Sequence, residues 1–464
     1  MSNINKFKLA VFVRDQKYYE QIEKYLQKTI SELDNVELTF IGESKINTEY
    51  NFINLTEYTE KIKVDIDENK FYETLDEDIW KNKKVYKADP RYVNNTKNLS
   101  WEDQYKLIFS CRKIFSEQNF DLILMGGAAY LFWIVPQLVA LEKNILSYKL
   151  FFFDYINPYF EGIRVWFCTD PFWDIDINSK FDFNWEKSKA IKHIKDLKTS
   201  IVEDDFNLDA IALTLREDFT PKKLKNIIKN ILKSVLSKDN LGPKRLKASI
   251  EAKKNEKLYI EFDNLPEKFL LFPLNQPVDE QLLLRAPGFE DNYKNLLFVM
   301  NNLDENVTLI VKEHPVNPGM FESKKIMELM SEYKNIYFIS PSVPLRKILR
   351  KSLGLVTINS TSGLESLLIN KNVLALGMGY YKKLESVHTI DNNSPKDIFS
   401  SMCQEETIVN PEEIDLMLQK ILNQTYPEPN LFPDKKLEAH KIMSDALYFK
   451  IKQVSNFNTT NSTS

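Results

Sequence analysis

The sequence predicts an α/β fold with mostly parallel sheets, divided into more than one domain. Between residues 307 and 381, short β-branched runs alternate with amphipathic segments, which is the pattern of consecutive βαβ units. A similar alternation begins the chain. Of the 464 residues, 43% are hydrophobic and 12% aromatic, so the chain can bury more than one core.

The first half is predicted to contain strand and helix repeats of its own. Residues 42–100 are polar and rich in tyrosine, and their weak periodicity supports no assignment. The expected strands are Phe7–Val13, Val36–Ile41 and Phe120–Met125, and the expected helices are Tyr18–Ile30 and Trp101–Phe115.

The second half carries the clearest pattern, and it ends in a proline-rich break. Beyond this break we expect a last helix at Asp434–Val454 and a frayed polar tail from Ser455 onward. We therefore predict an N-terminal α/β domain at residues 1–245 with a lysine-rich helical end, a C-terminal Rossmann-like domain at 246–425, and a helix with its tail at 426–464. The expected strands of the second domain include Val307–Lys312, Ile336–Ile339, Gly354–Ile358 and Val373–Leu376.

Charge and composition exclude several classes of function. The net charge of −4 argues against a protein that binds nucleic acid by general electrostatic attraction. The 62 lysines and arginines still allow local basic patches. Three widely spaced cysteines do not suggest a disulfide framework and are typical of a reducing cytoplasm. Only four histidines occur and no metal-binding motif is present, so no metal site is expected.

The sequence predicts a cytoplasmic protein. The first residues lack a charged flank that leads into a long apolar core, so no signal peptide is expected. The segment Leu122–Leu141 is nearly free of charge, but Gly126, Gly127 and Pro136 predict a buried strand, a turn and a buried helix. Peripheral contact of this segment with the inner membrane is the alternative.

Polar residues follow two strands of the predicted second sheet. Lys312, Glu313 and His314 close one strand, and Pro315 disfavours a helical conformation at His314. The second cluster comprises Asn359, Ser360, Thr361 and Ser362, and it leads into a helix. Ligands of parallel sheets bind at the carboxyl ends of the strands, and hydroxyls with free amides at a helix start suit an anion such as phosphate.

The second cluster also has an interpretation that requires no ligand. Ser362 and Glu365 have the spacing of a capping box, in which each side chain binds the backbone amide of the other. The two interpretations of Glu365 remain open. The presence of phosphate-compatible clusters after two strands of one sheet favours a binding site.

These motifs resemble those of the capsule polysaccharide biosynthesis family of bacterial glycosyltransferases, which includes Kdo transferases that use CMP-Kdo. The segment Leu270–Leu283 is similar to the family's Pro-Leu-Gln segment. Convincing resemblance covers residues 268–382. The family's His-Pro, Ser/Thr-rich turn, Gly-x-Glu, strand and Gly-x-x-Tyr pattern is matched by His314, Pro315, Ser360, Thr361, Ser362, Gly363, Glu365, Val373, Gly377 and Tyr380.

The resemblance implies two Rossmann-like domains facing a cleft, the GT-B arrangement, with the last helix packing back on the first domain. It also implies a donor site in which Ser360, Thr361 and Ser362 hold the phosphate, and in which Glu365 accepts two ribose hydroxyls. His314 would donate a hydrogen bond or a proton to the phosphate. Lys312, Asn359 and Gln276 complete the expected donor-binding residues. Gln276 and its neighbour Asn275 follow the first strand of this domain, where they are positioned to reach polar groups of the donor or the acceptor. No cofactor or metal is expected, since the nucleotide-sugar is a co-substrate.

The acidic catalytic group is expected in the aromatic segment Phe151–Trp173. The fragment from Glu161 to Arg164 is similar to, but shorter than, a Glu-x-Gly-x-x-Arg segment of the family. Glu161 and Asp154 are therefore the candidates. Such aromatic-rich segments also occur simply as protein core.

Three functions remain open at this point. The favoured one is transfer of a sugar, such as Kdo from a CMP donor, to a glycan or glycolipid acceptor of a growing capsular or surface polysaccharide. The others are transfer of a polyol phosphate from a CDP donor, as in teichoic-acid synthesis, and a nucleotide-sugar epimerase-like or catalytically silent assembly protein. The oligomeric state and the linkage formed are not predicted.

Overall fold

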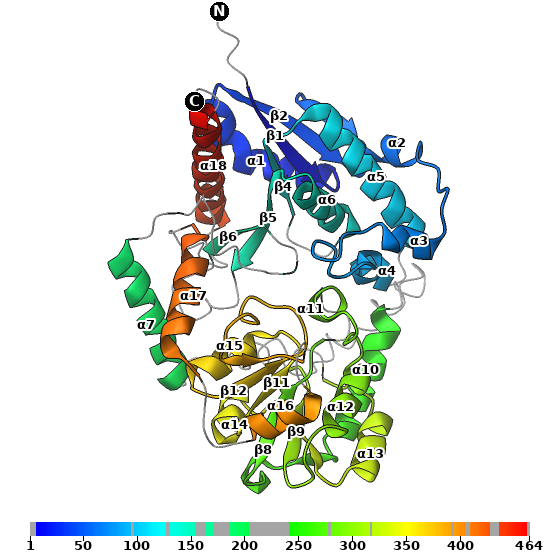
Figure 1. The fold of residues 1–464 in the computed structure, drawn as a ribbon, viewed down its shortest axis with the longest axis vertical. Coiled ribbons are helices and arrows are strands. Elements are labelled where there is room, and N and C mark those ends of the chain that lie inside the picture. The colour runs from blue at the N-terminus through cyan, green and yellow to red at the C-terminus, as the bar shows by residue number, and fades with distance from the viewer. Residues whose placement is uncertain are drawn as a thin grey trace, which may run out of the picture. The chain divides into compact units, whose positions relative to one another are not determined.

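The computed structural model shows two compact units, each built around one sheet (Figure 1). The first unit comprises Met1–Asp89, Leu99–His193 and Leu418–Ser464, and the second comprises Pro90–Asn98 and Ile194–Met417. The structure describes residues 6–93, 97–126, 130–153, 164–169, 172, 183, 186–203, 241–276, 280–315, 318–390, 394–403, 409–426 and 436–461.

The first unit contains a six-stranded sheet in the order β3-β2-β1-β4-β5-β6. All neighbouring strands are parallel except β5 and β6, which are antiparallel. The order from β3 to β5 is that of a doubly wound fold, with its switch point between β1 and β4. The strands are β1 (Phe7–Val13), β2 (Val36–Gly42), β3 (Asn51–Asn54), β4 (Leu122–Met125), β5 (Leu146–Phe153) and β6 (Arg164–Cys168).

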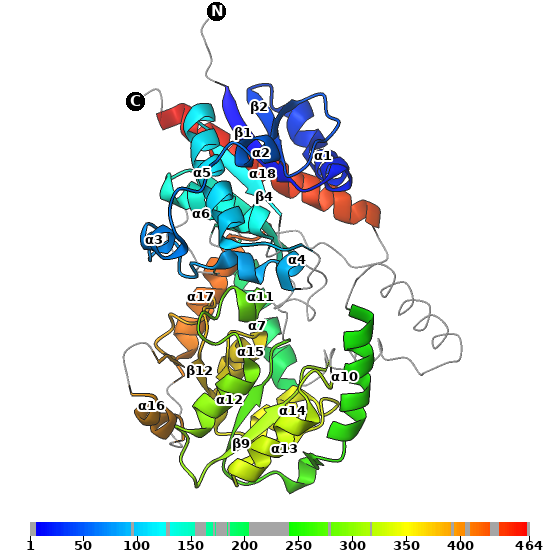
Figure 2. The same ribbon diagram turned by 90° about the vertical axis from the view of Figure 1, so that its right-hand side faces the viewer.

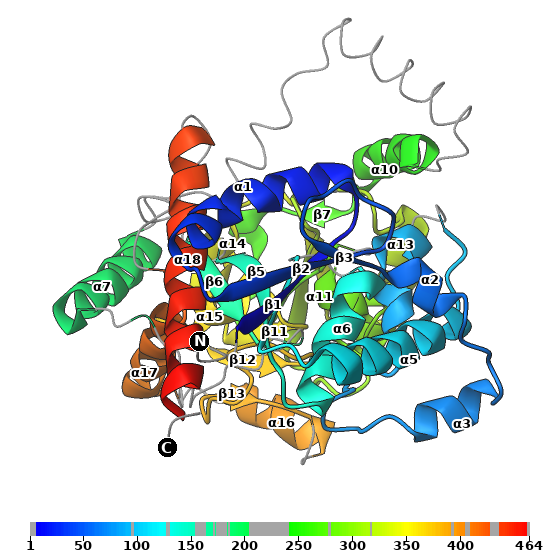
Figure 3. The same ribbon diagram turned by 90° about the horizontal axis from the view of Figure 1, so that it is seen from above.

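Helices cover both faces of this sheet because the side chains of a strand alternate between its faces. Helices α1 and α18 lie on one side of the sheet and α5 and α6 on the other (Figure 3). Leu9 and Val11 of β1 pack in one buried cluster with α1 and α18, whereas the Phe12 ring contacts Phe115 of α5 and Phe132 of α6. The helices are α1 (Gln16–Glu32), α2 (Leu55–Thr59), α3 (Glu68–Glu73), α5 (Trp101–Gln118), α6 (Leu131–Glu142) and α18 (Lys436–Asn461), with a 3₁₀ turn at Val85–Ala88.

The last helix completes the core of the first unit, as predicted. Met443, Leu447 and Ile451 of α18 lie in the same buried cluster as β1 and α1, and the Lys28 ammonium binds the Asp445 carboxylate at 2.5 Å. The helix continues beyond Val454, where we expected it to end, to Asn461, and Ser455 is 1% exposed.

The charge-free segment after the first switch-point strand is a strand and a helix, as the sequence indicates. β4 is buried along its length, and α6 buries nearly every residue despite the internal Pro136. No helix among the described residues combines the length and the apolar character that crossing a bilayer requires.

The second unit contains a seven-stranded parallel sheet in the order β13-β12-β11-β8-β9-β10-β7. From β10 to β13 this is the Rossmann order, with β8 as the first strand and the switch point between β8 and β11. The strands are β7 (Tyr259–Ile260), β8 (Phe269–Pro273), β9 (Thr308–Lys312), β10 (Ile336–Ile339), β11 (Gly354–Thr357), β12 (Asn372–Ala375) and β13 (Val387–His388).

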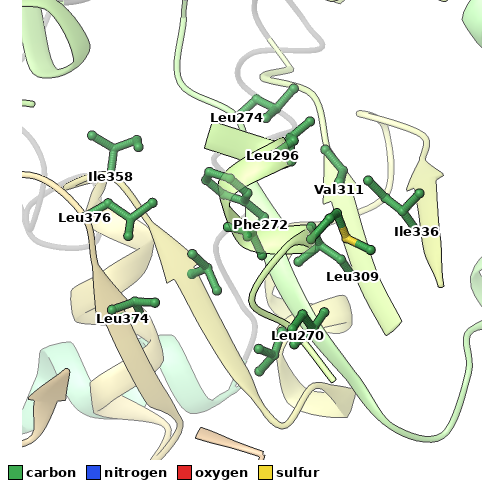
Figure 4. Packing of buried hydrophobic residues seen from close by; sticks show 14 of the residues in the cluster. Leu270, Phe272, Leu274, Leu296, Leu309, Val311, Ile336, Ile358, Leu374 and Leu376 are labelled. Carbon is green, nitrogen blue, oxygen red and sulfur yellow. The ribbon is translucent and has the colours of Figure 1, made fainter. Parts of the chain in front are cut away.

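Alternate strand residues form two cores on the two faces of this sheet. Phe272 and Val311 pack with Leu296 of α12 in the larger core, shown in Figure 4. Leu271 and Leu355 face the other core, which includes residues of α14. The helices are α10 (Leu241–Asn255), α11 (Glu280–Leu283), α12 (Asn292–Met300), α13 (Ser323–Glu332), α14 (Leu345–Lys351), α15 (Thr361–Leu368) and α16 (Pro395–Met402), with a 3₁₀ turn at Phe262–Asn264.

Helices α10 and α13 lie beside each other in the second unit (Figure 2). Glu251 of α10 accepts hydrogen bonds from the amide and the hydroxyl of Ser323, at 2.8 and 2.6 Å. The carboxylate thereby binds an amide at the start of α13 that has no partner within its own helix. The described part of the chain also contains α4 (Pro90–Val93), α7 (Lys187–Glu203) and α17 (Pro411–Asn423).

Candidate functional site

The sheet order of the second unit brings the two predicted polar clusters to the same edge. β8 pairs with β9 on one side and with β11 on the other, and all three are parallel. Their carboxyl ends therefore lie next to one another. Neighbouring strands are about 4.8 Å apart, so the chain at His314 and the chain at Asn359 leave the sheet roughly 10 Å from each other.

The loop after β9 is held by a buried carboxylate. Glu313, 3% exposed, accepts hydrogen bonds from the side chains of Tyr259 (2.5 Å) and Asn255 (3.2 Å). It also accepts bonds from the amides of Gly319 (3.1 Å) and Phe321 (3.0 Å). Burial, and then the neighbouring Glu313 charge, raise the pKa of Tyr259, which keeps its hydroxyl a donor. Glu313 thus fixes the loop that carries His314.

The Lys312 side chain is buried and binds a backbone carbonyl. Its side chain is 2% exposed, and Nζ donates to the carbonyl oxygen of Pro341 at 3.0 Å. The ammonium therefore ties the end of β9 to the loop after β10. Its predicted role in donor binding remains a prediction.

His314 shares a small pocket with residues that follow β8. The pocket has a volume of about 20 Å³ and is lined by His314, Asn275 and Gln276, among other residues. Met320 and Phe321 supply apolar walls. The sequence did not single out another lining residue, Asn292 of α12, because it follows the helix cap Asp291 and is indistinguishable from an ordinary first-turn residue.

The hydroxyl cluster forms the start of α15. Ser360 is the N-cap residue, and its hydroxyl hydrogen-bonds the hydroxyl of Thr357 at 2.8 Å and that of Ser362. The amides of Thr361 and Ser362 have no hydrogen-bond partner within the described part of the chain. Two free amides, hydroxyls and the positive end of the helix dipole together suit an anionic oxygen.

A hydrogen bond from Tyr381 holds this turn in place. Its buried hydroxyl donates to the carbonyl oxygen of Ser360 at 2.6 Å. A Cβ at Gly363 would lie 2.4 Å from the Tyr381 ring, so glycine is required for this close approach. The turn is therefore fixed by tertiary contacts as well as by the helix itself.

The predicted capping box does not form. Ser362 lies inside α15, at its second residue, and Glu365 is directed to another helix. Nη2 of Arg346, on α14, donates to Oε1 of Glu365 at 3.1 Å. Glu365 therefore binds Arg346, which is distant in the sequence, and does not bind the nearby backbone amide that the Ser-x-x-Glu spacing predicted. Arg346 was missed because it lies in a basic segment typical of an exposed helix face.

Asn359 connects three loops at the switch point. Its Nδ2 donates to the carbonyl oxygens of Gln281 (2.9 Å) and Met378 (3.0 Å). These carbonyls belong to the segments after β8 and β12, and Asn359 itself follows β11. The side chain thus acts as a brace for the site, and its predicted contact with the donor remains a prediction.

The two predicted catalytic carboxylates, Asp154 and Glu161, lie outside the described residues. Within the described residues, no group of three or more His, Cys, Asp or Glu side chains is arranged to hold a metal ion.

Known proteins match this chain over segments of different length. A family model described as "Capsule polysaccharide biosynthesis protein" matches residues 207–448. The capsule polysaccharide modification protein LipB of Neisseria meningitidis serogroup A is 34% identical over 122 residues, which are 25% of this chain and 29% of LipB. Protein FixF of Sinorhizobium fredii is 24% identical over 200 residues, 43% of this chain and 47% of FixF. The matched segments thus span less than half of these relatives.

Solved structures show weaker similarity. The β-Kdo 2,7 transferase KpsC of Thermosulfurimonas dismutans is 10% identical, with 94% of this chain and 99% of KpsC covered and a TM-score of 0.36. The UDP-GlcNAc 2-epimerase of Neisseria meningitidis is 13% identical, with 95% and 99% covered and a TM-score of 0.26. At these scores neither structure supports a functional inference.

Proposed function

The chain belongs to the family of capsule polysaccharide biosynthesis proteins, and we propose that it is a glycosyltransferase of the GT-B type. It transfers a sugar from a nucleotide-sugar donor to a growing bacterial capsular or surface polysaccharide. The reaction takes place on the cytoplasmic side of the inner membrane, where the donor is available.

The observation that carries this proposal is the position of His314 and the Ser360 turn on either side of β8. Breakage of the sugar–phosphate bond leaves negative charge on the phosphate. The free amides of Thr361 and Ser362 provide fixed donors for that charge, and the turn needs no rearrangement to present them. In this proposal the His314 imidazole donates a hydrogen bond or a proton to the phosphate.

The motif residues also suggest the donor. The Ser360 turn and Glu365 are arranged as in the sequence pattern of transferases that use CMP-Kdo, so we propose a CMP-linked acidic sugar such as Kdo. Glu365 lies one helical turn behind the phosphate position, where it would accept ribose hydroxyls. A carboxylate serves this purpose because hydroxyls donate to it.

Donor binding tests the proposal directly. Purified protein is titrated with CMP-Kdo, CMP, CDP-glycerol and UDP-GlcNAc, and its melting temperature is followed because a ligand that binds the native state raises it. Stabilisation by CMP and CMP-Kdo, followed by CMP release when a glycan acceptor is added, is the expected result. Stabilisation by UDP-GlcNAc alone would favour an epimerase-like protein, and by CDP-glycerol alone a polyol phosphotransferase. No stabilisation by any of these ligands would contradict the proposal.

A further inference from the structure

The two connections that flank the switch point of the first sheet meet through Arg14 and Tyr130. Arg14 directly follows β1, and Tyr130 lies between β4 and α6, so both residues belong to the carboxyl-end side of the sheet. The Arg14 guanidinium lies over the Tyr130 ring, 5.1 Å from its centroid. Ligands of open α/β sheets bind at such a switch point. The first unit therefore offers a position for a ligand of its own.

Two contacts hold the Arg14 side chain in one orientation. Nε donates to Oδ2 of Asp15 at 2.8 Å, and the Tyr130 ring supports the guanidinium. Asp15 is itself fixed, because its Oδ1 accepts from the amide of Tyr18 at 2.9 Å as the N-cap of α1. Nη1 and Nη2 of Arg14 have no hydrogen-bond partner within the described part of the chain, and the side chain is 38% exposed. They form an oriented pair of donors that a ligand can reach.

The Tyr18 hydroxyl is a further donor near this pair. Tyr18 lies in the first turn of α1, and its hydroxyl has no hydrogen-bond partner among the described residues. Burial raises the pKa of Tyr18, whereas the positive charge of Arg14 acts in the opposite direction. The hydroxyl is therefore protonated at neutral pH and donates a hydrogen bond beside the guanidinium.

Trp133 holds both tyrosines in place. Its ring centroid lies 5.1 Å from that of Tyr130 and 5.3 Å from that of Tyr18. A Cβ at Gly126, the residue after β4, would lie 2.5 Å from the Trp133 ring, so glycine lets the indole rest against the end of the strand. The side chains around Arg14 are thus fixed by packing from both sides of the switch point.

The charges around Arg14 determine which anion suits the site. The Asp15 carboxylate is already bound, and Glu43 after β2 is a second carboxylate whose charge acts on Arg14. Lys17 of α1 adds a positive charge near Asp15. These two cations and two carboxylates balance. A singly charged oxyanion is therefore favoured over a phosphate monoester, whose second negative charge would meet no compensating cation.

We propose that Arg14 and Tyr18 bind a singly charged oxyanion of the acceptor, either the carboxylate of a sugar acid or a phosphodiester. The two Nη groups match two oxygens of such a group, and the Tyr18 hydroxyl donates a third bond. The assignment to the acceptor rests on the proposed function, because it names the second substrate of that transferase. The anion site itself does not depend on the identity of the donor.

Small anions test the site without any donor present. The affinities of the purified protein for glucuronate, dimethyl phosphate and glucose are measured by ligand-observed NMR titration. Glucuronate represents a sugar carboxylate, dimethyl phosphate represents a phosphodiester, and glucose is a sugar without charge. We expect one or both anions to bind and glucose not to bind. Binding of glucuronate alone would assign the oxyanion to a sugar acid, and binding of dimethyl phosphate alone to a phosphodiester.

Substitutions at Arg14 and Tyr18 locate the binding. Arg14→Gln should weaken the affinity for the anion about tenfold or more, because hydrogen bonds to a charged group are lost. Arg14→Lys keeps the charge but not the paired donors, so its affinity should be intermediate. Tyr18→Phe removes only the hydroxyl and should have a smaller effect than Arg14→Gln. In an acceptor assay, Arg14→Gln should raise the KM for the acceptor and leave the KM for CMP-Kdo unchanged.

Lys24→Gln is the matched control. Lys24 is exposed on α1, so its substitution removes one positive charge from the same unit and should leave every affinity unchanged. The melting temperatures of these variants should stay close to that of the wild-type protein, because the Arg14–Asp15 pair is partly exposed and contributes little to stability.

The inference and the proposed function fail in different ways. Failure of both anions to bind, equal affinities of the wild-type protein and Arg14→Gln for them, or binding of glucose as tight as that of glucuronate would overturn the anion site. If CMP-Kdo binds under those circumstances, the proposed function stands alone. If the anions bind through Arg14 but no nucleotide stabilises the protein, the anion site stands and its assignment to an acceptor is overturned.

Discussion

Arg346 and Glu365 form an ion pair in which the side chains are only 7% and 10% exposed. Removing one partner of such a buried pair leaves an uncompensated charge. We expect Glu365→Gln to lower the free energy of unfolding by about 3 kcal/mol in urea denaturation. Glu322→Gln, which breaks the exposed pair with Lys247, should change it by less than about 1 kcal/mol. Equal changes in the free energy of unfolding for the two substitutions would show that the buried pair stabilises the fold no more than the exposed pair does.

The same variant tests the proposed ribose contact. If Glu365 also accepts ribose hydroxyls, Glu365→Gln will weaken CMP binding when measured well below its melting temperature. A variant that loses stability but binds CMP with unchanged affinity would restrict Glu365 to the ion pair.

His314→Ala should abolish most turnover while the fold is retained. The loop at His314 is held by the Glu313 carboxylate, which binds the amides of Gly319 and Phe321, so the melting temperature should change little. We expect the rate of CMP release to fall by about a hundredfold or more, the usual effect of removing a preorganised donor to a developing charge. His388→Ala is the matched control, since His388 lies in β13 of the same sheet and away from the β8 end. A similar loss of rate in both variants would argue against the site.

The pH dependence of stability should report on Glu251. Hydrogen bonds from Lys254 and then Ser323 lower its pKa from 4.5 to about 2. Folding therefore favours the ionised form, so this stabilisation is present above pH 4.5 and is lost as the pH falls towards 2. The urea midpoints of the wild-type protein and of Glu251→Gln should differ clearly at pH 7, and the difference should shrink steadily as the pH falls from 4.5 towards 2. A constant difference over this range would contradict the lowered pKa.

Gly363→Ala should disturb the turn at Ser360 through Tyr381. The added methyl group would force the Tyr381 ring to move, and overpacking of this kind costs about 1–3 kcal/mol of unfolding free energy. Displacement of Tyr381 also weakens its hydrogen bond to the Ser360 carbonyl, so CMP affinity should fall. Tyr381→Phe is the companion variant, because it removes only that bond and should have a smaller effect on both measurements.

The strands of the second sheet could be predicted because each is a short β-branched run bounded by polar residues. The expected strand at Ile336–Ile339 is observed with the same bounds, those at residues 307–312 and 354–358 differ by one residue at one end, and that at 373–376 is shifted by one residue. In the parallel sheet these strands also bring His314 and Ser360 to one edge. Residues 42–100 could not be predicted, because they form short elements whose few turns carry little periodicity.

Contacts between elements that are distant along the chain could not be predicted from the sequence. Glu365 has the local spacing of a capping residue, and only the packing of α14 against α15 supplies Arg346. Glu313 was grouped with His314 as part of a polar cluster, yet its four donors come from positions up to 58 residues away. Asn292 shows the same limitation, since its side chain binds the carbonyl of Asn275.

The contribution of α18 to the first unit has a consequence for biosynthesis. Leu447, Ile451 and Val454 cover apolar surface of α1 and β1, although more than 400 positions separate them along the chain. On the ribosome, the apolar surface of α1 and β1 in a nascent chain therefore stays exposed until translation has passed Val454. During that interval the N-terminal unit is a natural client for chaperones, and a fragment ending at residue 245 should aggregate unless the segment 418–461 is supplied in trans.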